Sequence, residues 1–301
     1  MSMIIKDLLA VAEARFREEG CLDPRLDAEL LFLHMRKEDR TYLFIHFGDK
    51  LDEKSCDEYF RLVDLRASGV PVQYITGKQE FMGLPFLVNE DVLIPRQDTE
   101  LLAERAIEEI KTRKDPFGGL RVLDLGTGSG ALAISIAHQL PKRKLKLFAT
   151  DISSKALAVA RRNADVNQVS GMIQFIEGDL LSPFPVNRKG KSKKPFDLII
   201  SNPPYIASGV IPTLMREVRE HEPLLALDGG PDGLDLYIRI LNEAHVHLKD
   251  DGLLLLEIGY DQGEVMKALV EVAGAYQPAE ILQDLTEKDR VAIIRKKTDT
   301  L

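Results

Sequence analysis

From Leu120 onward the chain alternates short apolar runs with longer amphipathic stretches, and this alternation constrains the fold more than any other feature of the sequence. The apolar runs predict strands, and the stretches between most of them predict helices. Strands joined by helices form a mainly parallel sheet with helices on both faces, and such a sheet binds its ligands at the carboxyl ends of the strands. We therefore expect an α/β fold. The predicted strands are residues 121–125, 145–150, 173–176, 196–201 and 253–258, and an antiparallel pair, 279–284 and 290–295, ends the sheet.

The N-terminal part follows a different pattern, because its apolar residues recur at helical spacing. Alternating apolar residues then predict a hairpin, and a helix is expected over residues 99–114. The sequence thus divides into a small helical bundle over residues 1–78, a hairpin linker over residues 79–97 and the α/β domain over residues 98–301. Within the bundle, helices are expected to include residues 40–47 and 52–68.

Composition narrows the class of protein. The formal net charge of −8 argues against a non-specific grip on nucleic acid, which needs a basic surface, so we expect no direct nucleic-acid binding. The two cysteines, Cys21 and Cys56, match no metal-binding spacing, so we expect free thiols in a reducing compartment and no metal site. No run approaches the roughly 20 apolar residues that span a bilayer. We expect a soluble cytoplasmic protein that contacts no membrane.

Asn202-Pro203-Pro204-Tyr205 directly follows the predicted strand 196–201. These residues suit a planar –NH2 nitrogen, which is a poor nucleophile because its lone pair is delocalised. Asn202 offers a side-chain carbonyl, and Pro203 fixes the backbone so that its own carbonyl can be a second acceptor. Pro204 holds the loop open, and Tyr205 offers a flat face for packing. Taken alone, the four residues suit a simple strand-ending turn about equally well.

A glycine-rich turn, Gly126-Thr127-Gly128-Ser129-Gly130, follows the first predicted strand of the α/β domain. Glycines let the backbone approach a ligand closely and place helix N–H groups against it. Their alternate spacing differs from the G-x-G-x-x-G of a dinucleotide-binding turn, although a nucleotide-binding domain remains an alternative. Asp151 ends the second strand, where a carboxylate can accept both ribose hydroxyls. Asp179 follows the third strand, where it can contact an adenine amino group, with Leu180 beside the ring.

Together these features resemble a class I S-adenosylmethionine-dependent methyltransferase, which has a Rossmann-like fold with a mostly parallel seven-stranded sheet. Residues 202–205 narrow the resemblance to methyltransferases that act on planar nitrogens. Four further segments resemble the HemK/PrmC family of protein-(glutamine-N5) methyltransferases, and the resemblance covers nearly the whole chain. The segments are residues 71–77 (PVQYITG), 81–86 (FMGLPF), 92–100 (VLIPRQDTE) and 222–234 (EPLLALDGGPDGL).

The resemblance implies a reaction in translation termination. A methyl group would pass from S-adenosyl-L-methionine to the glutamine side-chain nitrogen in the Gly-Gly-Gln loop of class-1 peptide chain release factors, leaving S-adenosyl-L-homocysteine. Residues 1–78 would recognise the substrate, and residues 98–301 would form the methyltransferase domain.

The resemblance also implies roles for individual residues. Asn202, Pro203 and Tyr205 would act in catalysis, and together with Pro204 they would bind the substrate amide. Asn202 would also lie against the cofactor. The cofactor-binding set would be Gly126, Thr127, Gly128, Ser129 and Gly130 at the methionine and ribose end, Asp151 at the ribose, and Asp179 with Leu180 at the adenine.

One residue departs from the family pattern, and one stretch of the sequence adds to it. Gln97 stands where the family usually has a second proline after arginine, and residues 188–194 form a basic stretch. That stretch is either a solvated loop or a contact for an acidic partner or ribosomal RNA.

Three alternative functions remain open. A sister enzyme of the family would methylate a glutamine of a ribosomal protein. A nucleic-acid amino methyltransferase, acting on adenine N6 or guanine N2, would need a basic cleft that this acidic chain does not suggest. A non-catalytic cofactor-binding module would be expected to carry a damaged glycine turn, whereas the turn is intact.

Overall fold

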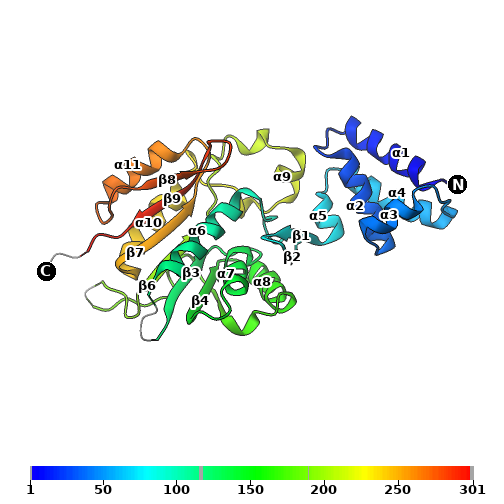
Figure 1. The fold of residues 1–301 in the computed structure, drawn as a ribbon. Coiled ribbons are helices and arrows are strands. Elements are labelled where there is room, and N and C mark those ends of the chain that lie inside the picture. The colour runs from blue at the N-terminus through cyan, green and yellow to red at the C-terminus, as the bar shows by residue number, and fades with distance from the viewer. Residues whose placement is uncertain (1, 115–117, 189, 299–301) are drawn as a thin grey trace. The chain divides into compact units, whose positions relative to one another are not determined.

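A computed structural model describes residues 2–114, 118–188 and 190–298. The chain divides into two compact units (Figure 1). The first unit comprises Met1–Lys78 together with Leu214–His221, and the second comprises Gln79–Thr213 and Glu222–Leu301. None of the described helices combines the length and the apolar composition that a bilayer crossing requires.

The first unit is helical, as expected. Its core is formed by apolar residues from several helices, with Tyr59 fully buried and its hydroxyl donating to the Ala28 carbonyl at 3.0 Å. Asp39 and Asp52 each cap the helix that follows, since their side chains accept from the Tyr42 and Ser55 N–H groups at 3.0 and 2.8 Å. The helices are α1 (Ile5–Glu18), α2 (Pro24–Arg36), α3 (Arg40–His46), α4 (Glu53–Ala67), α5 (Val72–Thr76) and α9 (Arg216–His221).

A buried ion-pair cluster joins three elements of this unit. The Arg66 Nε atom on α4 lies 2.7 Å from Asp27 Oδ2 on α2, and the Arg66 Nη2 atom lies 2.6 Å from Glu217 Oε2 on α9. Helix α9 therefore belongs to the first unit although it lies far along the chain. Both cysteines are free, with Cys56 buried.

The second unit contains a seven-stranded sheet in the order β5-β4-β3-β6-β7-β9-β8. Only β9 runs antiparallel to its neighbours, so the sheet is mostly parallel, as expected. The strands are β3 (Leu120–Leu125), β4 (Leu145–Asp151), β5 (Ile173–Glu177), β6 (Phe196–Ser201), β7 (Leu248–Glu257), β8 (Glu280–Gln283) and β9 (Asp289–Arg295).

Helices cover both faces of this sheet (Figure 1). Alternate residues of each central strand pack on opposite faces, as Val122 and Leu123 of β3 do. One face packs against α6 (Asp98–Thr112), α7 (Ala131–Gln139) and α8 (Ser154–Val166), and the other against α10 (Asp235–His247) and α11 (Gly263–Ala273). Short 3-10 turns cover Ser170–Met172, Ile211–Thr213 and Leu224–Ala226.

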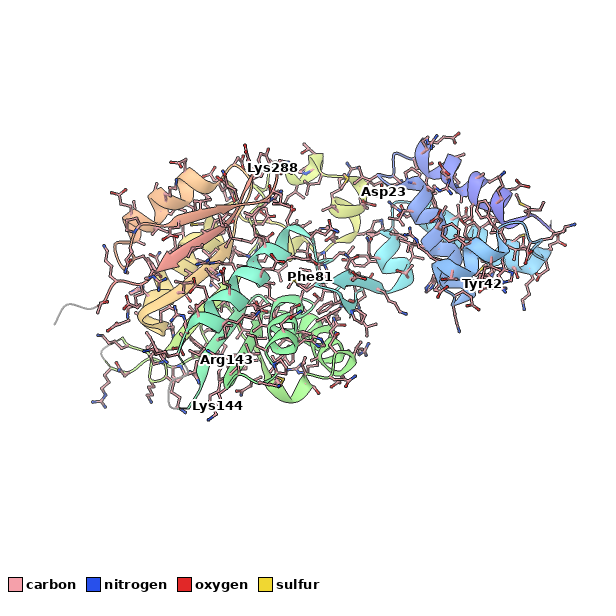
Figure 2. All side chains as sticks on the ribbon, in the orientation of Figure 1. Asp23, Tyr42, Phe81, Arg143, Lys144 and Lys288 are labelled. Atoms are coloured by element: carbon pink, nitrogen blue, oxygen red, sulfur yellow. The ribbon has the colours of Figure 1, made fainter. Side chains whose placement is uncertain are left out.

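The expected hairpin is present as β1 (Lys78–Phe81) and β2 (Leu84–Leu87). Met82 and Gly83 have φ values of 53° and 73°, and this pair of left-handed residues is typical of a type I′ turn. Phe81, labelled in Figure 2, packs edge-to-face on Phe86 with ring centroids 6.0 Å apart, and both are buried in the core of the second unit. The hairpin thus carries core residues of the α/β unit as well as connecting the chain.

Some elements differ from the sequence-based expectation. Strand β7 begins at Leu248 because Leu248 pairs with Phe196 across an irregular register, whereas the apolar run begins at Leu253. Helices α5 and α9 were not expected, since each is too short for helical periodicity to be visible.

Candidate active site

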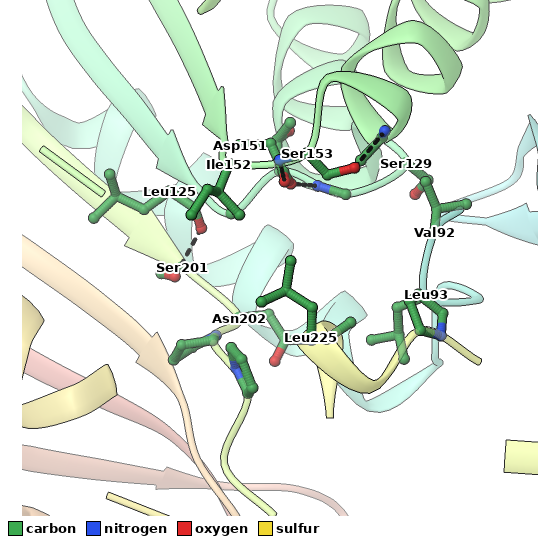
Figure 3. A pocket seen from close by; sticks show the side chains of 18 of the residues that line it. Val92, Leu93, Leu125, Ser129, Asp151, Ile152, Ser153, Ser201, Asn202 and Leu225 are labelled. Carbon is green, nitrogen blue, oxygen red and sulfur yellow. Dashed lines mark hydrogen bonds between the residues drawn. The ribbon is translucent and has the colours of Figure 1, made fainter. Parts of the chain in front are cut away.

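A pocket of about 290 Å³ lies at the carboxyl ends of β3, β4 and β6, within the second unit. Asp151 and Ser153 lie on one side of it, and Asn202 and Leu225 lie on the other (Figure 3). The sequence-predicted residues that line it are Gly126, Thr127, Gly128, Ser129, Asp151, Asp179, Leu180, Asn202, Pro203 and Pro204. Two other predicted residues, Gly130 and Tyr205, are not among those that line the pocket.

The glycine turn leaves open space where a ligand could lie. Gly126 and Gly128 have φ values of +68° and +56°, and a Cβ atom added at either would meet nothing within 4 Å. Gly130 also has a left-handed backbone, but there a Cβ atom would lie 3.2 Å from Ala160 Cβ. The first two glycines therefore keep the pocket wall bare, whereas Gly130 allows close packing against helix α8.

A buried aspartate that the sequence-based site did not include supports this turn. Asp124 accepts a hydrogen bond from the Thr127 hydroxyl at 2.6 Å and one from the Ala133 N–H at 3.3 Å. Burial raises the pKa of Asp124 to about 7, against the hydrogen bonds that act to lower it. Its position at the end of β3 was visible in the sequence, but its contact with Thr127 was not.

Asp151 holds its place at the end of β4 through two backbone contacts. Its carboxylate accepts from the Gly128 N–H at 2.8 Å and from the Ser153 N–H at 2.9 Å. Burial raises its pKa, and these two hydrogen bonds oppose that shift. Each carboxylate oxygen keeps a lone pair for a further donor, such as a ribose hydroxyl.

Asp179 forms an ion pair with another residue that lines the pocket. The Arg239 Nη2 atom on α10 lies 2.8 Å from Asp179 Oδ2, and both residues line the pocket. Arg239 was not predicted, because a basic residue on an amphipathic helix carries no signal of a site. The second Asp179 oxygen remains available to an amino group.

Asn202 directly follows β6. The last residue of that strand, Ser201, donates a hydrogen bond from its hydroxyl to the Leu125 carbonyl on β3 at 2.8 Å. The Asn202 Nδ2 atom donates to the Thr99 Oγ1 atom on α6 at 3.2 Å. Among the described residues, none donates a hydrogen bond to Asn202 Oδ1. Asn202 thus lines the pocket with its carbonyl oxygen available as an acceptor.

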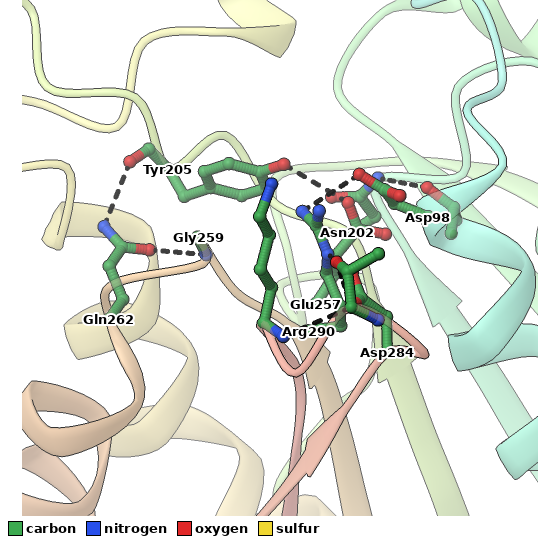
Figure 4. Close-up of polar contacts among 11 residues, drawn as sticks. Asp98, Asn202, Tyr205, Glu257, Gly259, Gln262, Asp284 and Arg290 are labelled. Atoms are coloured by element: carbon green, nitrogen blue, oxygen red, sulfur yellow. Dashed lines mark hydrogen bonds and ion pairs between the residues drawn. The ribbon is translucent and has the colours of Figure 1, made fainter.

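Tyr205 is not among the residues that line the pocket, and hydrogen bonds hold both its side chain and its main chain (Figure 4). Its hydroxyl donates to Glu257 Oε1 at 3.3 Å, and its main-chain oxygen accepts from the Gln262 Nε2 atom at 3.2 Å. Burial, with the Glu257 carboxylate beside it, raises the Tyr205 pKa. Cβ atoms on Gly229 and Gly233 would lie 2.8 Å from Tyr205 Cα and 2.3 Å from Tyr205 O. The glycines of segment 222–234 are therefore required by its close approach to the Asn202–Tyr205 loop.

An ion pair joins two of the segments that carry the family resemblance. Arg96 pairs with the buried carboxylate of Glu222, which also accepts from the Ile94 N–H at 3.4 Å. Gln97 directly precedes α6, and its carbonyl accepts from the Glu100 N–H at 2.9 Å. Within the basic stretch Lys189 lies outside the described residues, and Arg188, Lys193 and Lys194 are exposed.

Comparison with known proteins agrees with this architecture. The PrmC N-terminal domain model matches residues 7–77, and the methyltransferase small domain model matches residues 99–221. The chain is 40% identical to the release factor glutamine methyltransferase of Moorella thermoacetica, over 99% of this chain and all of that protein. It is also 40% identical to the Bacillus subtilis enzyme of the same name, over 89% and 91% of the two chains.

Solved structures show the same fold at low sequence identity. The hMettl16 catalytic domain, crystallised with a MAT2A 3'UTR hairpin, superimposes with a TM-score of 0.54 at 14% identity, over 84% of this chain and 86% of that one. The likeness concerns the class I methyltransferase fold alone. The 40% identity to the two enzymes extends over nearly the whole chain and shows more than the fold. The chain belongs to the release factor glutamine methyltransferase family.

Proposed function

We propose that this protein methylates the side-chain amide nitrogen of the glutamine in the Gly-Gly-Gln loop of class-1 release factors, using S-adenosyl-L-methionine. One observation carries the proposal. Asn202, whose Nδ2 atom is engaged by Thr99, offers its Oδ1 atom in the same pocket that the glycine turn and Asp151 line. An acceptor for an amide and a cradle for a nucleoside are thus adjacent.

The pocket residues fit S-adenosylmethionine. The bare wall at Gly126 and Gly128 has room for the methionine and ribose end, with Thr127, Ser129 and Gly130 completing the turn. Asp151 would accept the ribose hydroxyls, and Asp179 with Leu180 would contact the adenine. When bound, the cofactor supplies an electrophilic methyl group on a positively charged sulfur.

The substrate amide would be held by two acceptors. Asn202 Oδ1 and the Pro203 carbonyl would each accept one amide hydrogen, which directs the nitrogen lone pair toward the methyl group. Pro204 would keep the loop open, and Tyr205 would position it from behind. These oxygens also stabilise the positive charge that develops on nitrogen, so catalysis rests on positioning and on fixed dipoles.

The N-terminal unit would recognise the protein substrate. We assign this role to residues 1–78, with the hairpin over residues 79–97 leading into a catalytic domain over residues 98–301. Since release factors act on the ribosome, the enzyme would work in the cytoplasm.

The proposal is tested by mass spectrometry of a purified release factor after incubation with the protein and S-adenosylmethionine. We expect one added methyl group on the glutamine of the Gly-Gly-Gln loop. A parallel incubation with ribosomal proteins tests the sister reaction. Methylation found there, and absent from the release factor, would overturn the assignment.

A further inference from the structure

One end of the α/β unit is strongly basic, although the chain as a whole is acidic. This surface lies at the amino ends of the central strands, opposite the pocket at their carboxyl ends. Figure 2 labels two of its residues, Arg143 and Lys144. We name it the amino-end surface. Its described residues are 111–114, 118–121, 142–146, 188, 190–197, 248–251 and 295–298.

The amino-end surface holds a large share of the positive charge of the protein. Its described residues include eleven lysines and five arginines, but only three acidic residues, all of them aspartates. The rest of the chain therefore has 24 of the 40 basic residues and 45 of the 48 acidic residues. The net charge of −8, from which we expected no contact with nucleic acid, is thus the sum of two regions with opposite charge.

The three aspartates do not neutralise this surface. Asp197 and Asp250 pair with Lys249 and Lys296, with N–O distances of 2.7 and 3.3 Å. Much of the positive charge is therefore left for a partner. The exposed lysines that form no ion pair with a carboxylate among the described residues include Lys142, Lys144, Lys146, Lys193 and Lys194.

Hydrogen bonds hold two segments of this surface together. The Arg143 Nη2 atom donates to the Ile110 and Arg113 carbonyls at 2.8 and 2.6 Å, which joins the segment before β3 to the segment before β4. The Leu120 N–H donates to the Lys144 carbonyl at 2.8 Å. The basic residues of these two segments therefore lie on a fixed backbone, side by side.

The segment before β6 is also held in place. Val186 pairs with Ser192 in an antiparallel bridge, and the Ser192 N–H donates to the Val246 carbonyl on α10 at 3.0 Å. The sequence left residues 188–194 open between a solvated loop and a contact for a partner. In the structure, the described part of this stretch extends the basic surface that the segments before β3 and β4 form.

The side chains of this surface favour nucleic acid over a protein or a membrane as its partner. Lysine is depleted from protein–protein interfaces, whose buried centres are rich in apolar and aromatic side chains. Stable membrane attachment needs apolar groups in addition to basic residues. None of the large apolar side chains that are exposed in the described structure belongs to the amino-end surface. A lysine-rich surface without an apolar centre is instead typical of contact with a phosphate backbone.

We propose that the amino-end surface binds the phosphate backbone of double-stranded RNA, without reading its bases. The surface exposes no aromatic ring on which a base could stack, since Phe196 is buried. The choice of RNA rests on the proposed function, because release factors act on the ribosome. The six residues of β3 span about 20 Å between this surface and the pocket, so RNA and a substrate glutamine can be bound together.

Anisotropy titration of a fluorescently labelled RNA duplex of about 16 base pairs tests the binding with the full chain. We expect a Kd of about 1–100 μM near physiological salt, and a logarithm of the association constant that falls linearly with the logarithm of the salt concentration. A DNA duplex of the same sequence should bind more weakly, because B-form DNA spaces its phosphates farther apart along the axis than A-form RNA does.

Two double variants test the location of the binding surface. Lys142→Gln with Lys144→Gln, and Lys193→Gln with Lys194→Gln, each remove two positive charges from it. Each double variant should raise the Kd for RNA at least about tenfold at low salt and reduce the salt slope by about 1–2.

Lys267→Gln with Lys288→Gln is the matched control. It makes the same change in net charge, but on α11 and in the turn before β9, away from the amino-end surface. Its Kd for RNA should stay at the wild-type value.

Several results would overturn this inference. These are a wild-type chain that does not bind RNA, equal RNA affinity in all three double variants, and tighter binding to DNA or to phosphatidylserine vesicles than to RNA. Methylation of free release factor should be unchanged in the Lys142→Gln, Lys144→Gln variant. A raised KM for release factor in that variant, with RNA binding unchanged, would assign the surface to protein docking instead.

The titration contains neither release factor nor S-adenosylmethionine, so its outcome is separate from that of the methylation assay. A chain that binds RNA as expected but does not methylate release factor overturns the proposed function alone. A chain that methylates release factor but does not bind RNA overturns this inference alone.

Discussion

A Cβ atom on Gly233 would lie 2.3 Å from the main-chain oxygen of Tyr205, so a residue other than glycine at this position would overlap the loop that carries Asn202. The two segments also pair as strands would, with Ile206 bridged to Asp228. Backbone packing alone therefore requires a glycine here, although Gly233 does not line the pocket.

Gly233→Ala should destabilise the enzyme and slow it. Gly233 has a φ of +73°, which costs a non-glycine residue about 1–2 kcal/mol, and the overlap with Tyr205 adds to this. We expect a decrease of at least about 3 °C in the melting temperature by calorimetry, together with lower kcat. Gly209→Ala is the control, because a Cβ atom there meets nothing within 4 Å and no left-handed φ is involved. Equal melting temperatures for the two variants would show that the approach of Gly233 to Tyr205 is not tight.

Asn202→Ala should reduce turnover far more than cofactor affinity. The variant loses one of the two proposed amide acceptors, and loss of one such group costs about 100-fold or more in kcat. Titration calorimetry should give a Kd for S-adenosylmethionine within a few-fold of the wild type. Asn242→Ala, at an exposed position on α10, should leave both values unchanged. Comparable losses of turnover and cofactor affinity in Asn202→Ala would contradict the assignment of Asn202 to the substrate amide.

Asp151→Asn should weaken cofactor binding. Replacement of a charged acceptor by a neutral one removes about 1.5–3 kcal/mol of hydrogen bonding, so the Kd for S-adenosylmethionine should rise about tenfold to 100-fold. In a thermal-shift measurement the cofactor should raise the melting temperature of the wild type more than that of the variant. Asp165→Asn, on the exposed side of α8, is the matched control. Wild-type affinity in Asp151→Asn would remove Asp151 from the cofactor site.

Arg66→Met should destabilise the first unit strongly. The substitution leaves the carboxylates of Asp27 and Glu217 without their shared partner, and loss of one member of a buried ion pair costs about 3–5 kcal/mol. In urea unfolding followed by circular dichroism, the first unit of the variant should unfold at a lower urea concentration than that of the wild type. Arg17→Met removes an exposed pair with Glu13 and should change the free energy of unfolding by less than about 0.5 kcal/mol. If both variants unfolded at the same urea concentration, the buried cluster would contribute little to the free energy of unfolding.

Asp124 should make the stability of the second unit depend on pH. Burial raises its pKa from 3.8 to about 7, so the folded protein binds a proton that the unfolded chain has released. Its contribution to the free energy of unfolding is therefore largest below about pH 4 and is lost as the pH rises to about 7, by at most about 1.4 kcal/mol per pH unit. Wild type should lose stability over this range relative to Asp124→Asn, as measured by denaturant unfolding at several pH values. Parallel curves for the two proteins would contradict the raised pKa.

Much of the architecture could be predicted from local patterns. Strand β4 ends at Asp151 and strand β6 at Ser201, as the apolar runs indicated, and the parallel order places both ends at one edge of the sheet. Periodicity did not reveal α5 or α9, because five or six residues do not define a helical repeat. It also did not show that the Leu214–His221 segment belongs to the first unit, where Glu217 pairs with Arg66, because no local pattern marks a partner so far away in the sequence.

The fold class, the glycine turn and the position of Asn202 after a strand follow from local patterns, because periodicity and backbone chemistry are properties of short segments. The groups that hold Asn202 and Tyr205 could be identified from long-range contacts alone. Thr99 lies 103 residues from Asn202 and Glu257 lies 52 from Tyr205, and no local pattern marks either as a partner. Their roles arise where α6, β6 and β7 bring separate segments into a buried space, in which each polar group must find a hydrogen-bonding partner.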